Sequence, residues 1–244
     1  MALADNRIKV AVKGEWPEPM TLRRGLARAE ARRWNTAVDD ASLRLTRGGP
    51  AFIASCAETL LGFGATAVFS PPLPSASHRQ WLTAGFEHSV SLALMRTSLD
   101  QKPHTPNHLV VEQESEVLEQ FLAIDQAAFS GFWQFDLHGL REAVDSTSSS
   151  DLLAIQGPDA EPVAFAIVGY GHAISYLQRL AVHPDWQGQG MGRSLVRSVL
   201  RRARAKGARA MLLNTQFENE AAIKLYRDEG FSLLPDPLAL LKFG

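Results

Sequence analysis

Residues 180–196 combine glycine, polar and basic residues in a way that suits the binding of an anion. The segment reads LAVHPDWQGQGMGRSLV, where a short apolar strand leads to Gly188, Gly190 and Gly192 and then to an amphipathic helix with no acidic residue in its first turns. Glycines allow a tight turn with accessible N–H groups, and a helix N-terminus adds unpaired donors and a positive dipole end. The segment therefore predicts a binding site for a diphosphate group.

The glycine spacing separates three kinds of nucleotide-binding loop. A dinucleotide-binding loop that starts at Gly188 would need a glycine where Arg193 stands, and a Walker loop would need Gly-Lys-Ser/Thr. The remaining pattern, Q-x-x-G-x-G from Gln187 to Gly192, resembles the acetyl-CoA loop of the GNAT superfamily of acyl-CoA-dependent N-acyltransferases. A glycine cluster on its own is also typical of a plain turn.

A second motif follows at the distance expected for that family. Residues 219–231 read NEAAIKLYRDEGF and match N-x-x-A-x-x-L-Y-x-x-x-G-F at every named position. The resemblance implies that Tyr226 lies beside the thioester sulfur and protonates the departing thiolate, while Asn219 hydrogen-bonds the cofactor arm. A phenol of pKa about 10 is protonated at neutral pH yet acidic enough to protonate a forming thiolate of pKa about 8.5. The alternative is a core tyrosine packed with Leu225 and Phe231.

The resemblance also implies a set of cofactor contacts. The strand that ends at 180–182 would pair with the pantetheine almost as with an added strand, and the next strand, 211–216, would splay away to open a slot. A bulge at the splayed strand would offer an N–H group to the thioester oxygen. The predicted cofactor-binding residues are Leu180, Ala181, Val182, Gln187, Gly188, Gln189, Gly190, Met191, Gly192, Arg193, Ser194, Asn214, Asn219 and Tyr226.

The basic residues of the helix after the glycines have two interpretations. Arg193, with Arg197 one turn further on, is predicted to contact cofactor phosphates, because a guanidinium fork suits phosphate oxygens. Arg201, Arg202 and Arg204 are interpreted as a solvated helix face, since charged side chains on an amphipathic helix need no ligand.

The group that accepts the proton of the attacking amine stays open. GNAT enzymes that acetylate protein N-termini carry a glutamate where this chain has Asn214, and asparagine is not a base. Glu218, Asp136, His172 and a water held by Gln178 and Asn214 remain as alternatives. The aromatic segment 129–135 (FSGFWQF) either lines an amine pocket or packs the edge of a helix. The predicted substrate contacts are Phe132, Trp133, Phe135, Asp136 and Gln178.

Residues 108–244 show the order of elements that these motifs need. We expect a strand at 108–111, a helix at 116–129, strands at 152–155, 163–170 and 173–182, a helix at 191–206, and then a strand, a helix and a strand. The resemblance implies an α/β (α+β) fold, with a mixed twisted sheet flanked by helices.

A similar order recurs in the first half of the chain. Residues 65, 85 and 92 correspond to 208, 230 and 238 at a nearly constant displacement, which indicates an internal duplication. We expect a shortened, degenerate GNAT-like domain at 1–96, a proline-containing linker at 97–107 and a complete GNAT domain at 108–244, as in tandem GNAT proteins such as mycothiol synthases. Arg47 replaces a loop glycine of the first half and Trp81 stands where the acid tyrosine would be, so this half is predicted to be a scaffold.

The composition restricts the class of protein. The 244 residues are 45% hydrophobic with a net charge of −1, which does not suggest a chain built to coat nucleic acid or anionic lipid. The lone cysteine, Cys56, excludes an internal disulfide, and no signal-peptide pattern is visible near the start. The apolar stretch 51–69 is interrupted by Glu58 and two glycines. We expect a cytoplasmic protein without a membrane span or bound metal, as a monomer or homodimer.

These patterns together predict an N-acetyltransferase. It would move an acetyl group from acetyl-CoA to a primary amine, on a small molecule or on a peptide or protein N-terminus, by direct attack in a ternary complex, since no nucleophile relay is evident. The alternative is a CoA-binding sensor or protein-interaction module with little turnover. Asn214 favours the alternative, and Tyr226 argues against it.

Overall fold

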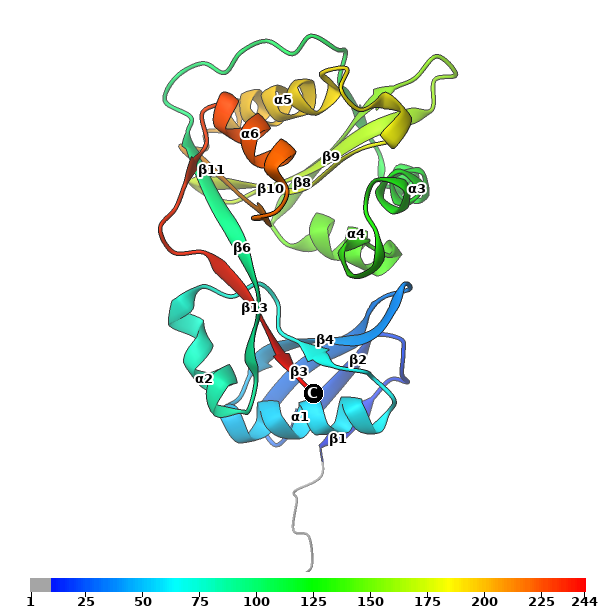
Figure 1. Cartoon of the computed structure of the whole chain (residues 1–244), viewed down its shortest axis with the longest axis vertical. Coiled ribbons are helices and arrows are strands. Elements are labelled where there is room, and N and C mark those ends of the chain that lie inside the picture. Colours follow the sequence, from blue (N-terminus) through cyan, green and yellow to red (C-terminus); the bar gives the residue numbers. More distant parts are fainter. Residues whose placement is uncertain (1–9) are drawn as a thin grey trace, which may run out of the picture. The chain divides into compact units, whose positions relative to one another are not determined.

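A computed structural model describes residues 10–244, which divide into two compact units (Figure 1). One unit contains the described residues up to Leu92 together with Asp236–Gly244, and the other contains Ala93–Pro235. Strand β6 (Glu87–Ser98) continues from the first unit into the second. The last nine residues thus group with the N-terminal unit, whereas the sequence pattern assigned them to the C-terminal half. No helix within residues 10–244 is long and apolar enough to cross a membrane.

The first unit is a mixed sheet with helices on one face. In chain order its elements are β1 (Ala11–Lys13), β2 (Met20–Arg24), β3 (Ala27–Asn35), β4 (Val38–Arg47), α1 (Pro50–Gly62), β5 (Val68–Phe69), α2 (His78–Thr83), the first part of β6, and β13 (Leu238–Phe243). Strands β1 to β4 pair antiparallel, β5 pairs parallel with β4, and β13 lies antiparallel between β5 and β6. Because β13 completes this sheet, the C-terminal residues group with the first unit.

Trp81 is part of the core of the first unit. This residue of α2 is 1% exposed and packs edge-on against Phe86, with ring centroids 4.9 Å apart. It lies in an apolar cluster with side chains of α1 and of β2 to β4. The indole therefore fills the core, and the scaffold role of this half stays a prediction.

The second unit contains most of the sequence motifs. Its elements after β6 are β7 (Val111–Gln113), α3 (Leu118–Ala128), α4 (Leu137–Asp145), β8 (Ser149–Gln156), β9 (Pro162–Tyr170), β10 (Ile174–Val182), α5 (Met191–Ala205), β11 (Ala210–Gln216), α6 (Glu220–Asp228) and β12 (Ser232–Leu233). The strand order is β7-β8-β9-β10-β11-β6, with β12 paired to β6. Neighbouring strands from β7 to β10 are antiparallel, as are β12 and β6, whereas β10 and β11 are parallel. The expected strands and helices of this half are present with shifted ends.

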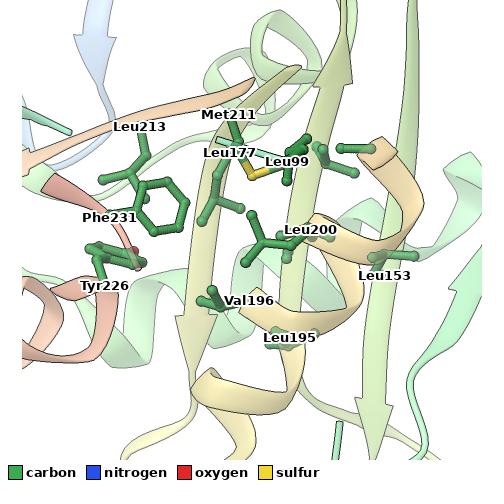
Figure 2. Packing of buried hydrophobic residues seen from close by; sticks show 14 of the residues in the cluster. Leu99, Leu153, Leu177, Leu195, Val196, Leu200, Met211, Leu213, Tyr226 and Phe231 are labelled. Atoms are coloured by element: carbon green, nitrogen blue, oxygen red, sulfur yellow. The ribbon is translucent and has the colours of Figure 1, made fainter. Parts of the chain in front are cut away.

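Each face of this second sheet has its own helices and its own apolar cluster. Helices α5 and α6 lie on one face and α3 and α4 on the other (Figure 1). Leu195, Val199 and Leu200 of α5 are almost fully buried against β8 to β11. Figure 2 shows this cluster, in which Tyr226 and Phe231 lie at one end beside Leu213 of β11. Burial of the α5 stripe fixes the helix, and with it the glycine turn that precedes it.

Helix α4 was not predicted from the sequence. Its apolar residues are few, but Asp136 supplies an N-cap, since its Oδ1 accepts a hydrogen bond of 2.7 Å from the Gly139 N–H. Leu140 and Ala143 then turn into the cluster on the α3 face. A capping carboxylate followed by two apolar residues at i+4 and i+7 was the available signal.

Strands β10 and β11 separate after a short parallel contact. Their pairing covers only Ile174 to Tyr176 of β10, opposite Ala210 to Leu212 of β11, although both strands continue. This confirms the predicted splay. The pairing of β10 with β9 is irregular between Leu177 and Arg179, where Gln178 of β10 is an extra residue inserted opposite β9. The expected bulge at the splayed strand stays a prediction.

The two units share the order of elements that indicated a duplication. In each unit a strand, a helix and a parallel strand follow one another, as β4-α1-β5 and as β10-α5-β11. Gly64 and Gly207 end the crossover helices with φ of +102° and +87°, where a residue with a side chain would be strained. These agreements support the duplication, which stays a prediction.

A buried carboxylate fastens the C-terminal turn of α5 to the sheet. Asp151 of β8 accepts hydrogen bonds from the Tyr170 hydroxyl at 2.6 Å, from Arg202 at 3.0 Å and from Lys206 at 3.0 Å. Burial alone would raise the pKa of the Asp151 carboxyl, but these hydrogen bonds outweigh it and hold the pKa below its ordinary value. The charge of Asp151 therefore stabilises the folded state at neutral pH.

Replacement Asp151→Asn is expected to lower the free energy of unfolding by about 2 kcal/mol at pH 7, because it leaves two cations beside a neutral amide. A group with a lowered folded-state pKa contributes stability above its unfolded pKa of about 3.9 and loses it as pH falls through the folded value. The difference from the native chain should therefore shrink below about pH 4. Urea titrations at several pH values measure this difference in the free energy of unfolding, and Asp159→Asn in an exposed turn is the control. Equal effects of the two substitutions would contradict the prediction.

Candidate active site

The glycine turn leaves a row of backbone donors open to solvent. Residues 187–190 are exposed, and Gly188 and Gly190 take left-handed φ values of +75° and +82°. Within the described residues, no backbone N–H of 188–193 donates a hydrogen bond to another residue. These unpaired N–H groups converge on the start of α5, where its dipole is positive. The turn thus has the geometry of an anion-binding cradle.

Helix α5 packs on α6 at Gly192. A Cβ at this position would be in van der Waals contact, at 3.4 Å, with Cδ2 of Leu225 in α6, the residue next to Tyr226. Glutamate 229, at the end of α6, has a side chain only 2% exposed and accepts from Arg193 at 3.1 Å and from Arg197 at 2.9 Å. Arg193 also pairs with Asp228 at 2.9 Å. The two arginines predicted to contact phosphates therefore hold α6 against α5.

The remaining polar residues of α5 are also engaged. The Ser194 hydroxyl, predicted to contact cofactor, is 1% exposed and accepts hydrogen bonds from the backbone of Asn107 and His108. Arg201 and Arg204 donate to carbonyl groups of the 97–107 segment, and Arg202 pairs with Glu112 and Asp151. The interpretation of these three arginines as a purely solvated face was wrong. The segment interpreted as a free linker offers carbonyl groups that the guanidinium donors can reach.

Tyr226 is buried on α6, but its hydroxyl is not used by the protein. The residue is 7% exposed and packs near Phe231, with ring centroids 5.8 Å apart (Figure 2). Among the described residues its hydroxyl has no hydrogen-bond partner. Burial raises the pKa of the phenol to about 12, and the nearby cation of Arg179 partly opposes this shift. The phenol is thus protonated at physiological pH and has its O–H free for a ligand.

The edge of β10 beside the glycine turn is the other open feature. Leu180, Ala181 and Val182 pair with β9 but have no partner on β11, because the two strands have already separated. Leu180 and Val182 pack against the cluster that contains Tyr226, whereas Ala181 is buried on the α3 face. The Gln187 side chain donates to the Val182 carbonyl at 3.0 Å and ties the turn to the strand end. Met191 is buried as the first residue of α5, and Gln189 is exposed.

The two predicted asparagines lie on β11 and at the start of α6. Asn219 is the N-cap of α6, and its Oδ1 accepts from the Ala222 N–H at 3.2 Å, which leaves its NH₂ group for a ligand. Asn214 is exposed on β11 after the strands separate. Their contacts with a cofactor stay a prediction.

The candidates for a proton acceptor are scattered. Asp136 is committed to capping α4, and His172 lies in the turn before β10, at the end of that strand opposite the glycine turn. Glu218 is exposed in the turn between β11 and α6. Gln178 occupies the bulge, and its Nε2 lies 3.2 Å from where a Cβ of Gly169 would be. No carboxylate or imidazole among the described residues contacts the Tyr226 hydroxyl.

The aromatic segment 129–135 is organised by a residue that the sequence analysis missed. The Arg179 guanidinium lies between two rings, 3.7 Å from the Phe129 centroid and 3.9 Å from that of Phe135. It pairs with the fully buried Asp125 at 2.5 and 2.9 Å and donates to the Trp133 carbonyl at 2.8 Å. This arrangement combines charge, stacking and hydrogen bonds. Two of the four aromatics therefore pack on a cation.

The other two aromatics contact each other. Phe132 and Trp133 meet edge to face with centroids 5.1 Å apart and are partly exposed, and their contact with a substrate stays a prediction. The Asp125 carboxylate also accepts from the Phe135 N–H at 2.7 Å. The sequence could have indicated that Arg179 has a buried partner. This residue is charged and stands in the largely apolar strand Leu177 to Val182, and a buried charge has to be paired.

Comparison with known proteins places the motifs in one family. Residues 118–231 match the acetyltransferase (GNAT) family. Over 63 residues the chain is 40% identical to a mycothiol acetyltransferase of Thermobifida fusca, a segment that covers 26% of this chain and 20% of that protein. Over 69 residues it is 36% identical to the ribosomal protein bS18-alanine N-acetyltransferase of Escherichia coli, covering 28% of this chain and 47% of that protein. The chain thus spans less than half the length of either relative.

Among solved structures, a tandem GNAT protein from the clavulanic acid biosynthesis pathway is similar over almost the whole chain. The TM-score is 0.62 at 14% sequence identity, and the alignment covers 96% of this chain and 83% of that chain. At this identity the likeness shows the fold. It confirms the predicted α/β architecture, in which mixed twisted sheets are flanked by helices, and the tandem arrangement.

Replacement Arg179→Lys is expected to loosen the segment 129–135. Lysine keeps the charge but loses the planar fork and the stacking on both rings. We expect the free energy of local opening to fall by about 1.4 kcal/mol, which makes amide exchange in this segment about tenfold faster. Hydrogen–deuterium exchange measured by mass spectrometry reports it, with α5 as an internal reference. Arg141→Lys on the exposed face of α4 is the matched control. Unchanged exchange in 129–135 would show that Arg179 does not hold the segment.

Proposed function

Since residues 118–231 form a GNAT acetyltransferase domain, we propose that this chain transfers an acetyl group from acetyl-CoA to a primary amine. The amine belongs to a small molecule or to the N-terminus of a peptide or protein. The observation that carries the proposal is the buried Tyr226, whose free hydroxyl lies at the end of the apolar cluster that also receives the separating strand β10. The Tyr226 hydroxyl would thus be a proton donor beside the open edge of β10.

Cofactor binding follows from the two open sets of backbone groups. The N–H groups of residues 188–193 would hold the diphosphate, and the free edge of Leu180–Val182 would pair with the pantetheine amides. Both are rigid parts of regular elements, so little ordering would be required on binding. Arg193, tied to Asp228 and Glu229, would act by holding α6 in place.

The chemical step would be a direct attack of the amine on the thioester carbon. The amine nitrogen forms a bond to the carbonyl carbon, the C–S bond breaks, and the thiolate takes the proton of the Tyr226 hydroxyl. The ammonium formed on the amine loses its proton to water, because Asp136 is a cap and Asn214 is not a base, and that water returns a proton to the Tyr226 phenolate. A backbone N–H at the β10 bulge would stabilise the oxyanion.

Burial makes the Tyr226 phenol a weaker acid, and neighbouring charges also affect its pKa. With a pKa of about 12 the phenol stays protonated at physiological pH, and its proton would move to the sulfur as the C–S bond breaks. The Arg179 cation favours the phenolate that remains after proton transfer. The same guanidinium thus links the acid to the segment proposed to cover the acceptor.

Replacement Tyr226→Phe should lower kcat by about 10²- to 10⁴-fold with little change in the Kd of acetyl-CoA, since only the proton donor is lost. Release of free CoA is measured against a panel of primary amines and peptides with an N-terminal alanine. Tyr176→Phe, on the start of β10, is the matched control and should retain turnover.

An unchanged kcat for Tyr226→Phe would remove the acid role. A native chain that binds acetyl-CoA but releases no CoA above hydrolysis with any acceptor would instead favour a CoA-binding sensor or interaction module. Failure of the native chain to bind acetyl-CoA would contradict the proposal as a whole.

A further inference from the structure

The segment between β6 and β7 is fastened along the whole length of α5. Three arginines on one helix face donate to its carbonyl groups: Arg204 to Leu99 at 3.0 Å, Arg201 to Pro103 at 3.3 Å and Arg197 to Thr105 at 3.2 Å. Ser194, one turn before Arg197, receives the end of the segment. We call residues 99–108 the strap. Its path along the helix brings His108 to the start of α5.

The hydrogen bonds around Ser194 determine which nitrogen of His108 carries the proton. The Ser194 Oγ accepts from the N–H groups of Asn107 and His108, both at 3.2 Å, and lies 3.0 Å from His108 Nδ1. A hydroxyl has two acceptor lone pairs and one proton. Because both lone pairs are occupied by N–H groups, the Ser194 proton is donated to Nδ1. The neutral imidazole is therefore protonated at Nε2.

The Nε2–H group of His108 is a donor without a partner, next to the glycine turn. A Cβ placed on Gly190 would lie 3.8 Å from His108 Cε1, the ring carbon bonded to Nε2. Among the described residues no hydrogen bond involves Nε2, and the side chain is half-buried. The imidazole edge thus extends the row of free N–H donors at residues 188–193.

The cations that would be expected at this place are used elsewhere. Arg193 and Arg197 are paired with Asp228 and Glu229, and Arg197 also donates to the strap. A charged diphosphate at the turn would therefore meet backbone donors and one imidazole rather than a free guanidinium.

We propose that His108 donates a hydrogen bond from Nε2 to a diphosphate oxygen of the bound coenzyme, so that the strap supplies part of the cofactor site. The inference rests on the proposed function, because the glycine turn must bind a coenzyme diphosphate. It assigns a binding role to the segment between the two halves of the chain. Ser194 acts through His108 as a positioning residue.

The test replaces His108 by asparagine. Asparagine still accepts from Ser194 at the place of Nδ1 but has no group at the place of Nε2, so the strap stays fastened and the donor is lost. The Kd of CoA, measured by titration calorimetry, is expected to rise about tenfold. The Kd of 3′-dephospho-CoA, which keeps the diphosphate, should rise by the same factor, and that of pantetheine should not change. Leu109→Ala, at a side chain that is 82% exposed, is the control.

The imidazole itself gives a second measurement on the native chain. Addition of CoA should shift the ¹⁵N resonance of His108 Nε2, and addition of pantetheine should not. A native chain that fails to bind CoA would contradict the proposed function together with this inference. A native chain that binds CoA, with the same Kd in His108→Asn, would overturn the inference alone. An effect on CoA that is missing with 3′-dephospho-CoA would also overturn it, since His108 would then contact the 3′-phosphate.

The same variants distinguish unfolding of the protein from loss of the His108 donor alone. Thermal unfolding of His108→Asn should match that of the native chain within about 2 °C, because no buried contact is removed. An equal weakening of CoA binding in Leu109→Ala and His108→Asn would show that the strap acts by packing, and would overturn the role of the imidazole.

Discussion

The structure depends on the point where β10 and β11 stop pairing. Two neighbouring parallel strands normally satisfy each other's backbone groups along their shared length, and an open edge inside a sheet is costly unless water or a ligand completes it. Here the ladder ends after Tyr176 and Leu212, although both strands continue. The crossover helix α5 starts from the far end of β10, so its free N–H groups and the open strand edge belong to one continuous feature. The backbone groups proposed to bind the coenzyme lie along it, and His108 of the strap lies beside its helix end.

Ion pairs at both ends of α5 keep this feature in place. Asp151 holds the C-terminal turn, and Glu229 joins the first turns to α6 through Arg193 and Arg197. A carboxylate as buried as Glu229 would be expensive to desolvate alone, and two guanidinium partners offset that cost. The same contact fixes α6 and hence Tyr226 relative to the glycine turn. The motif residues of the two helices are therefore held together by side chains that the motifs do not include.

Local sequence patterns predicted the turns, helices and strands of the backbone. They were less informative about which partners the long arginine side chains contact. Glycine spacing, helical periodicity and apolar strand patterns each depend on near neighbours in the chain, and the structure has the turn, the helices and the splayed strands there. Helix α4 was missed because a single cap and two buried residues are a weak signal. The partners of Arg193 lie more than thirty residues away, so no local pattern distinguishes an arginine that binds phosphate from one that clamps a helix. The role of the strap was hidden for the same reason, since its donors are on α5.

Guanidinium groups in the second unit hold protein segments in place. Arg197, Arg201 and Arg204 fasten the strap, and Arg179 fastens the segment 129–135 between two rings. Asp125 neutralises Arg179 inside the protein, and the rings of Phe132 and Trp133 in the same segment carry no charge. In the proposed function, anion recognition would fall to the backbone N–H groups of the glycine turn and one imidazole, whose donors are fixed by the fold. Acceptor choice would then belong to a segment that the glycine motif does not specify.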